Sequence, residues 1–203
     1  MKNFLLFFLI VILHLNIYSQ VKFRYGITAG LNVSTAILPE LKLNTNLNNI
    51  LHGDNVIQGK PQLADYVAMY KAGVFIKLEG GVAALKLSLN YDKTNIHKDL
   101  DAGIFSINAL DIDLGYLDFE MKAQLYIFKH FYISSGYIPA LLIEHQGNLD
   151  INDFDQRILG GFGFRFSNGI TLDFDAIIGL SEIIDGSYIH NVMIPMTLNI
   201  PLN

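Results

Sequence analysis

Strict alternation of apolar and polar residues is the feature that most limits what this chain can fold into. In "YLDFEMKAQLYIF", residues 116–128, the apolar set Leu117, Phe119, Met121, Ala123 and Leu125 alternates with Asp118, Glu120, Lys122 and Gln124. Several of these residue types favour helices. On a helix, however, residues two apart point about 160° away from each other, so no apolar stripe would form. On a strand each set occupies one face, and we therefore predict a strand.

The same alternation recurs along most of the chain. It predicts eight strands, at about 22–36, 69–79, 82–92, 109–127, 131–145, 156–167, 170–181 and 189–201. Just upstream of Leu117, the apolar residues Leu110, Ile112 and Leu114 fall on the opposite phase. We expect a β-bulge near Gly115 to reconcile the two phases, because an extra residue moves every later side chain to the other face.

The connections between these strands alternate in length. Short turns are predicted at 79–81, 129–130 and 167–169, and longer polar connections at 37–68, 93–108, 146–155 and 182–188. Outer-membrane barrels have this rhythm, with short periplasmic turns and long extracellular loops. We therefore predict an all-β fold, an eight-stranded antiparallel up-and-down transmembrane β-barrel over residues 20–203. The alternative is a soluble eight-stranded barrel or sandwich, such as a periplasmic carrier, which would bury its apolar face.

Composition favours the membrane. The chain is 51% hydrophobic and only 16% charged, yet it contains no run of about 20 apolar residues that would form a membrane-spanning helix. The polar faces carry few Lys or Glu and many Gly, Ser, Thr and Asn, which suits a narrow lumen. Aromatic residues near the expected strand ends predict interface girdles: these are Tyr25, Tyr91, Tyr116, Tyr126, Phe128, Phe131 and Tyr132.

The first residues resemble an export signal. "MKNFLLFFLIVILHLNIYSQ" has a basic start, an apolar core and a small residue at Ser19, and we expect a signal peptide over 1–19 that is cleaved before Gln20. An uncleaved membrane anchor is the alternative. The chain has no cysteine, so it has no disulfides and no lipid-bearing cysteine. The 14 Lys and Arg residues are not clustered, and no nucleic-acid partner is expected.

Three stretches resemble the PorT-like outer-membrane β-barrel family of Gram-negative bacteria. They are "FRYGITAGLNVST" (23–35), "YLDFEMKAQLYIFKHFYISSGYIPALL" (116–142) and "RILGGFGFRFSNGITLDFDAIIGLSEI" (157–183). The resemblance implies a barrel in the Gram-negative outer membrane, in contact with lipid, without enzymatic activity. One branch of the family assists protein secretion, which implies other envelope or secretion proteins as partners.

Charged residues on the polar faces have two interpretations. Asp111 and Asp113, and likewise Asp173 and Asp175, share one face of a strand, and paired carboxylates can carry out acid–base chemistry or bind a cation. In a narrow lumen, pairing with inward cations is the better interpretation. We predict an ion-pair network that fills the lumen, with Arg165 pairing with Asp173 or Asp175. Its members are Lys86, Asp118, Glu120, Lys122, Arg165, Asp173 and Asp175.

Other motifs predict no catalytic, cofactor or metal site. "GGFGF" (160–164) lacks the third glycine of a dinucleotide loop, and Gly161 and Gly163 are expected on the inner face, where they leave room for a large neighbour. The Asp-rich stretch 148–157 is interpreted as a solvated turn, with surface calcium as the alternative. The histidines share no ligand spacing. The predicted function is a non-enzymatic structural or interaction barrel; the alternative is a small channel or ligand-binding barrel.

Overall fold

The structure, a computed structural model, describes residues 21–38, 62–102, 105–146, 151–183 and 189–203. The predicted signal peptide and most of the predicted loop 37–68 lie outside these residues. The described part contains nine strands: β1 (Lys22–Leu38), β2 (Gln62–Leu63), β3 (Val67–Gly80), β4 (Ala83–Ala102), β5 (Phe105–Phe128), β6 (Phe131–His145), β7 (Phe154–Arg165), β8 (Thr171–Gly179) and β9 (His190–Pro201).

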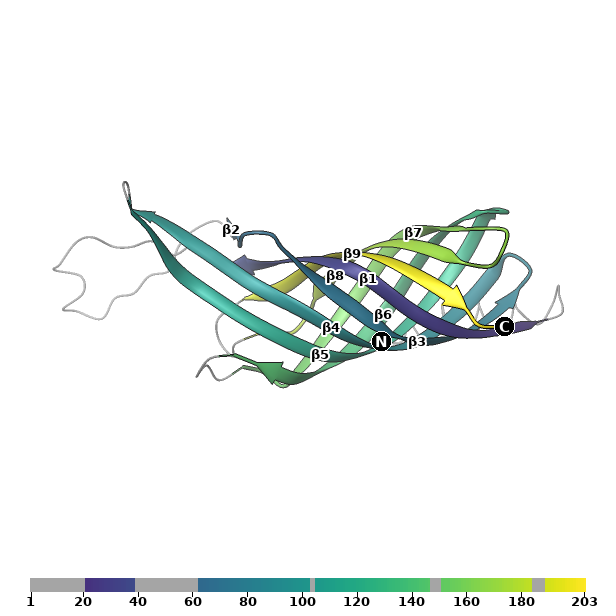
Figure 1. Cartoon of the computed structure of the whole chain (residues 1–203), viewed down its shortest axis with the longest axis horizontal. Helices are drawn as coiled ribbons and strands as arrows, with labels where there is room; N and C mark the ends of the chain where they lie inside the picture. Colours follow the sequence, from purple (N-terminus) through teal and green to yellow (C-terminus); the bar gives the residue numbers. More distant parts are fainter. Residues whose placement is uncertain (1–20, 39–61, 103–104, 147–150, 184–188) are drawn as a thin grey trace.

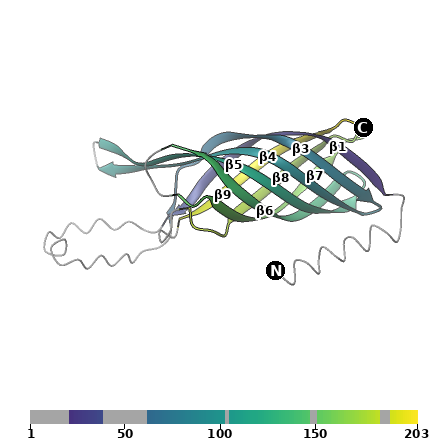
Figure 2. The ribbon, with the colours of Figure 1, turned by 90° about the horizontal axis from the view of Figure 1, so that it is seen from below.

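Eight of these strands close into a barrel. Each strand from β3 to β8 pairs antiparallel with the strand that follows it in the chain. Strand β1 pairs with both β3 and β9 and so closes the ring. The short β2 pairs only with the last two residues of β1. Figures 1 and 2 show the strands running obliquely around the barrel. Among the described residues, the structure therefore confirms the predicted eight-stranded up-and-down barrel.

The barrel has two different ends. At the turn end, β3–β4 and β5–β6 are joined at 81–82 and 129–130, and β7–β8 at 166–170. Gly81 (φ 56°) and Gly169 (φ 87°) adopt the left-handed conformation that these turns require. The opposite end, called the loop end here, carries the longer connections. There the β4–β5 pair projects beyond its neighbours (Figures 1 and 2).

The middle of the barrel is polar inside and apolar outside. On β5, Asp118, Glu120 and Lys122 are buried, whereas Phe119 is 44% exposed and Leu125 is 49% exposed. The other strands repeat this pattern, and exposed apolar side chains include Ile27, Leu31, Val74, Ile76, Leu89, Ile133, Leu141, Ile158, Phe162, Ile178, Ile194 and Met196. This is the polarity of a transmembrane barrel. A soluble barrel, the alternative, would have the reverse.

Within the described ranges, no helix is both long enough and apolar enough to cross a membrane.

Polarity reverses at the loop end. Here Ile96, Ile112 and Leu114 are buried, while Lys93 is partly exposed and Asp111 is exposed. The apolar set faces inward and the polar set outward, as in a protein surrounded by water. The prediction of a connection at 93–108 is therefore wrong, because β4 and β5 contain all of these residues except 103–104. It resembled a loop because Asn, Asp and Lys are poor strand formers and because its alternation has the opposite phase.

The bulge expected near Gly115 is present, but it lies on the neighbouring strand. The pairing of β5 with β6 does shift between Gly115 and Tyr116, whose partners are Glu144 and Leu142. The extra residue, Ile143, belongs to β6. The pairing of β5 with β4 runs through this region without a shift. Strand β5 thus keeps one phase from Asp111 to Tyr126, and it is the surroundings of each face that change along it.

The predicted aromatic girdles are only partly present. Tyr25 is 46% exposed and Phe128 is 69% exposed. Tyr116 and Tyr132, by contrast, are buried inside the barrel, and the Tyr126 hydroxyl contacts lumen charges. These three tyrosines lie at inward positions of their strands, so proximity to a strand end was the wrong criterion.

Candidate functional site

The lumen is the candidate site, and all eight barrel strands contribute buried side chains to it. Glycines on the inner wall make room for the larger ones. A Cβ built on Gly163 of β7 would overlap the ring of Tyr132 on β6, and one on Gly161 would collide with the carboxylate of Asp175 on β8. The expectation that these two glycines face inward beside large neighbours is confirmed.

Lys122 lies at the centre of the lumen charges. Its Nζ is 2.5 Å from Asp175 Oδ2, 3.0 Å from Asp173 Oδ2 and 3.4 Å from Glu120 Oε1. Lys86 joins the same group, 3.4 Å from both Glu120 and Asp173. The Tyr132 hydroxyl donates a hydrogen bond to Asp173. All of these charges are buried, and their mutual pairing offsets the desolvation that an isolated buried charge would suffer.

Arg157 organises a second group nearer the loop end. Its guanidinium, fully buried, lies 2.7 Å from Asp155, 3.2 Å from Asp118 and 3.7 Å from Asp92. It also stacks on the ring of Tyr116, 4.0 Å from the ring centroid. Lys71 connects the two groups, because its Nζ contacts Glu120 at 3.1 Å and Asp118 at 3.9 Å.

Glu79 organises a third group at the turn end. Lys77 lies 2.7 Å away, Arg24 3.1 Å away and Arg165 3.5 Å away. The Tyr126 hydroxyl donates to the same carboxylate at 3.1 Å. Among the described residues, seven lumen cations thus face seven carboxylates. The cations are Arg24, Lys71, Lys77, Lys86, Lys122, Arg157 and Arg165, and the carboxylates are Glu79, Asp92, Asp118, Glu120, Asp155, Asp173 and Asp175.

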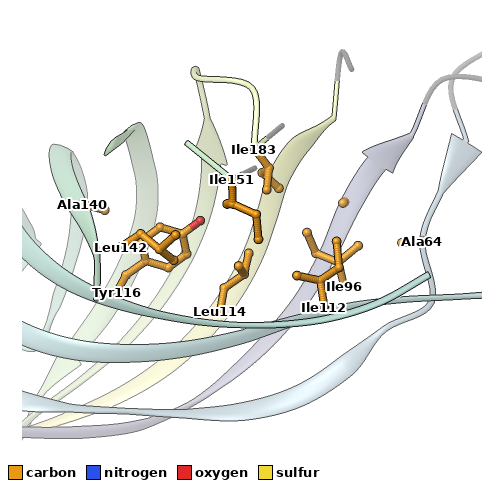
Figure 3. Packing of buried hydrophobic residues seen from close by; sticks show 10 residues of the cluster. Ala64, Ile96, Ile112, Leu114, Tyr116, Ala140, Leu142, Ile151 and Ile183 are labelled. Carbon is orange, nitrogen blue, oxygen red and sulfur yellow. The ribbon is translucent and has the colours of Figure 1, made fainter. Parts of the chain in front are cut away.

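An apolar cluster seals the loop end above Arg157. Figure 3 shows Tyr116, Leu114 and Ile112 of β5 in this cluster, with Ile151 and Ile183 from the connecting segments turned towards them. The segments are tied together by backbone: Asn152 N–H donates to the Ile183 carbonyl at 2.8 Å. The other members are Ala36, Ala64, Ile96, Ala140 and Leu142, with Ile189 packed against them.

Six of the seven residues expected in the lumen lie in the connected central groups: Lys86, Asp118, Glu120, Lys122, Asp173 and Asp175. Arg165 is the correction, because its salt bridge is with Glu79 rather than with Asp173 or Asp175. Asp173 and Asp175 follow Arg165 closely in sequence, across the β7–β8 turn. Arg165 ends β7 beside this turn, however, whereas the two aspartates lie further from it along the barrel.

Sequence reasoning missed Lys71, Lys77, Glu79 and Arg157. The first three share one phase of "YKAGVFIKLEG", so the alternation itself contained the signal. Arg157 and Asp155 fell in the stretch interpreted as a solvated turn, yet they lie in β7 and are buried together. Residues 148–150 of that stretch lie outside the described part. Among the described residues, no His, Cys, Asp and Glu group has a metal-binding arrangement.

Chemically, the lumen is a column of mutually paired charges under an apolar cap. A carboxylate that acts as a base or nucleophile must be reachable by a substrate. The carboxylates of the central and Arg157 groups are buried and already contact cations. The arrangement therefore supports a filled, ordered interior rather than a reaction centre.

No family model matches the chain, and no curated protein matches it. The PorT-like resemblance accordingly rests on the three stretches of sequence alone. Two crystal structures align with the barrel. One is of Ail, the attachment invasion locus protein of Yersinia pestis, with 10% identity, a TM-score of 0.46, and coverage of 87% of this chain and 96% of that chain. The other is of Ail in complex with the heparin analogue sucrose octasulfate, with 10% identity, a TM-score of 0.43, and coverage of 88% and 97%. Likenesses this distant carry no inference about what this chain does.

Proposed function

We propose that this chain is a non-enzymatic outer-membrane barrel with a closed lumen, which acts through contacts at its surface. The observation that carries the proposal is the column of buried, mutually paired charges in the interior. The Glu79, Lys122 and Arg157 groups follow one another along the axis, and the apolar cluster covers the last of them. Such an interior leaves structural or interaction work to the loops and to the outer surface.

Planar-bilayer recording tests this proposal. Purified, folded protein should give no discrete single-channel steps, because a solute would have to displace paired charges and the apolar cap together. A general porin reconstituted in the same way is the positive control. Well-defined steps of constant size from the wild-type protein would contradict the closed lumen and favour the alternative, a small channel or ligand-binding barrel.

Location is a separate part of the proposal. The apolar outer band and the sequence of residues 1–19 support export to the Gram-negative outer membrane after signal cleavage. The mature protein should remain in the membrane fraction after a carbonate wash, and its N-terminal sequence should begin at Gln20. Release by the wash would contradict the location, while an N-terminus at Met1 would contradict cleavage only.

A role beside other envelope proteins, including protein secretion, is the finer proposal. It is supported by the PorT-like resemblance of residues 23–35, 116–142 and 157–183. Deletion of the gene should then reduce secreted protein without changing permeability to small solutes. Unchanged secretion would remove the secretion role and leave the closed barrel standing.

A further inference from the structure

A cationic cavity opens at the turn end, where the Glu79 group forms part of its wall. Its volume is about 300 Å³, and its charged lining is Lys22, Arg24, Glu79, Lys129 and Arg165, with His130 beside them. The residues come from the start of β1, from the ends of β3 and β7 and from the β5–β6 turn. The cavity therefore exists only in the closed barrel, where these chain segments meet.

Arg165 is held in a fixed position in this cavity. Its guanidinium stacks on Tyr126, 4.4 Å from the ring centroid, and lies 3.5 Å from Glu79. Its Nη2 donates to the Lys129 carbonyl at 3.2 Å. The side chain is nonetheless 28% exposed. A guanidinium that is oriented and still accessible is suited to binding an oxyanion such as phosphate.

The cavity has more positive than negative charge. Glu79, the one carboxylate in its lining, already contacts Lys77, Arg24 and Arg165. Lys22 and Lys129 form no salt bridge with any residue that the structure describes. Four cations thus line the cavity with a single, shared carboxylate, and the net positive charge that remains favours the binding of an anion.

An apolar cavity adjoins the cationic one. Its volume is about 420 Å³, and it shares His130, Arg165, Phe166 and Ser167 with the first. Phe164 and Leu172 complete its lining on the outer, membrane-facing side. Phe164 is 41% exposed and Phe166 is 51% exposed. Charge at the rim and apolar side chains immediately outside it form one continuous amphipathic site.

We propose that this site binds an anionic phospholipid, with the headgroup phosphate against Arg165, Lys129 and Lys22 and an acyl chain along Phe164 and Phe166. A soluble phosphate would use only the cationic half, whereas the lipid uses both. Basic pockets beside a membrane surface are suited to anionic lipid headgroups. The proposal rests on the transmembrane barrel and is independent of whether the lumen conducts.

Native mass spectrometry of the detergent-purified full chain, titrated with phosphatidylglycerol or phosphatidylcholine, tests the proposal. The wild-type protein should retain one phosphatidylglycerol in preference to phosphatidylcholine. The double variant K22Q/K129Q removes two cations that have no salt bridge, and its affinity should fall roughly 25-fold, about fivefold for each charge. The matched control is K93Q, which removes a lysine at the opposite end and should leave binding unchanged.

Two further arms separate lipid from free anion. F164S alters only the apolar cavity, so it should weaken phosphatidylglycerol binding without changing the weak binding of inorganic pyrophosphate. F128S changes an exposed phenylalanine outside both cavities and should change neither. Heat-modifiable gel mobility establishes that each variant is folded before it is titrated. The proposal is overturned if phosphatidylcholine binds equally well, if K93Q matches the double variant, or if pyrophosphate binds as tightly as the lipid and F164S has no effect.

Discussion

Single buried charges in this barrel depend on the partners around them. Arg157 serves three carboxylates from β4, β5 and β7, and Lys122 serves two on β8. A buried ion pair adds little net stability compared with a well-packed apolar pair, but removing one partner leaves an uncompensated charge. The lumen therefore tolerates simultaneous changes far better than single ones.

Arg157→Met should be among the most damaging single substitutions. It leaves Asp155 buried without a cation and Asp118 with only Lys71, 3.9 Å away. We expect a loss of about 3–5 kcal/mol in the free energy of unfolding. Urea titration of the reconstituted barrel, followed by heat-modifiable mobility, measures it. Lys93→Gln is the control: Lys93 is partly exposed and lies 4.0 Å from Asp113, so its loss should cost within about 1 kcal/mol. Equal effects would show that the Arg157 group is not stabilising.

Two glycines three residues apart on β7 provide a matched comparison of inner and outer wall. A Cβ on Gly163 would overlap the Tyr132 ring, whereas one on Gly160 meets nothing within 4 Å. Gly163→Ala should therefore destabilise the barrel by about 1–3 kcal/mol through overpacking. Gly160→Ala should be neutral or stabilising by up to about 1 kcal/mol, because it restricts the unfolded chain. The same urea titration measures both, and a harmless Gly163→Ala would contradict the tight inner wall.

Elements such as β4 and β5 pass through two environments. Towards the turn end, both strands have polar side chains facing the lumen and apolar side chains facing outward, as lipid requires. Towards the loop end the arrangement is reversed. The change occurs near Tyr91 on β4 and Gly115 on β5, which are adjacent across the sheet: Tyr91 pairs with Leu117 and Lys93 with Gly115. The edge of the apolar band is therefore set at one height on both strands.

A charge placed on the outer face should destabilise the barrel on the turn-end side of this boundary and be tolerated on the loop-end side. Phe119→Arg puts a guanidinium in the apolar band and should cost about 2–4 kcal/mol if it lies near the bilayer midplane. Asp111→Arg places the same group on the same strand at the loop end, where Asp111 is exposed. It should lower the free energy of unfolding by no more than about 1 kcal/mol. Folding yield into vesicles and urea midpoints measure both. Similar costs at the two positions would contradict the proposed boundary.

The whole molecule is stabilised by closure as much as by its lumen. Twelve residue pairs join β1 to β9 and leave no free edge between the first and last strands. The pairing of β1 with β3 places Arg24 within 3.1 Å of Glu79. Closure then brings Arg24 next to the β7–β8 turn, where its Nη1 lies against Gly169. The cationic cavity at the turn end is consequently a property of the closed ring.

Deletion of residues 190–203 should abolish the folded barrel. Without β9, neither β1 nor β8 has the strand that it pairs with at the closure of the ring. Refolding into detergent should therefore give no heat-modifiable band. Deletion of 202–203 alone removes exposed residues whose bonds are to the Tyr25 and Phe23 backbone, and it should retain the band. A compact, heat-modifiable species without β9 would show that seven strands close on their own.

Alternation in the sequence determined the strands, the turns and the set of residues on each face, because side-chain direction on a strand has a strict period of two. That is why six of the seven expected charges lie together in the central lumen. Alternation alone does not say which medium each face meets. The tertiary structure decided that Ile112 and Leu114 face inward on the same phase as Asp118, since both the lumen and the exterior change character along the barrel. It also decided the partners: strand tilt and stagger bring Arg165 to Glu79 rather than to Asp173, and bring Arg157 to Asp118. Pairing across a closed ring depends on where every strand lies, and no local pattern contains that information.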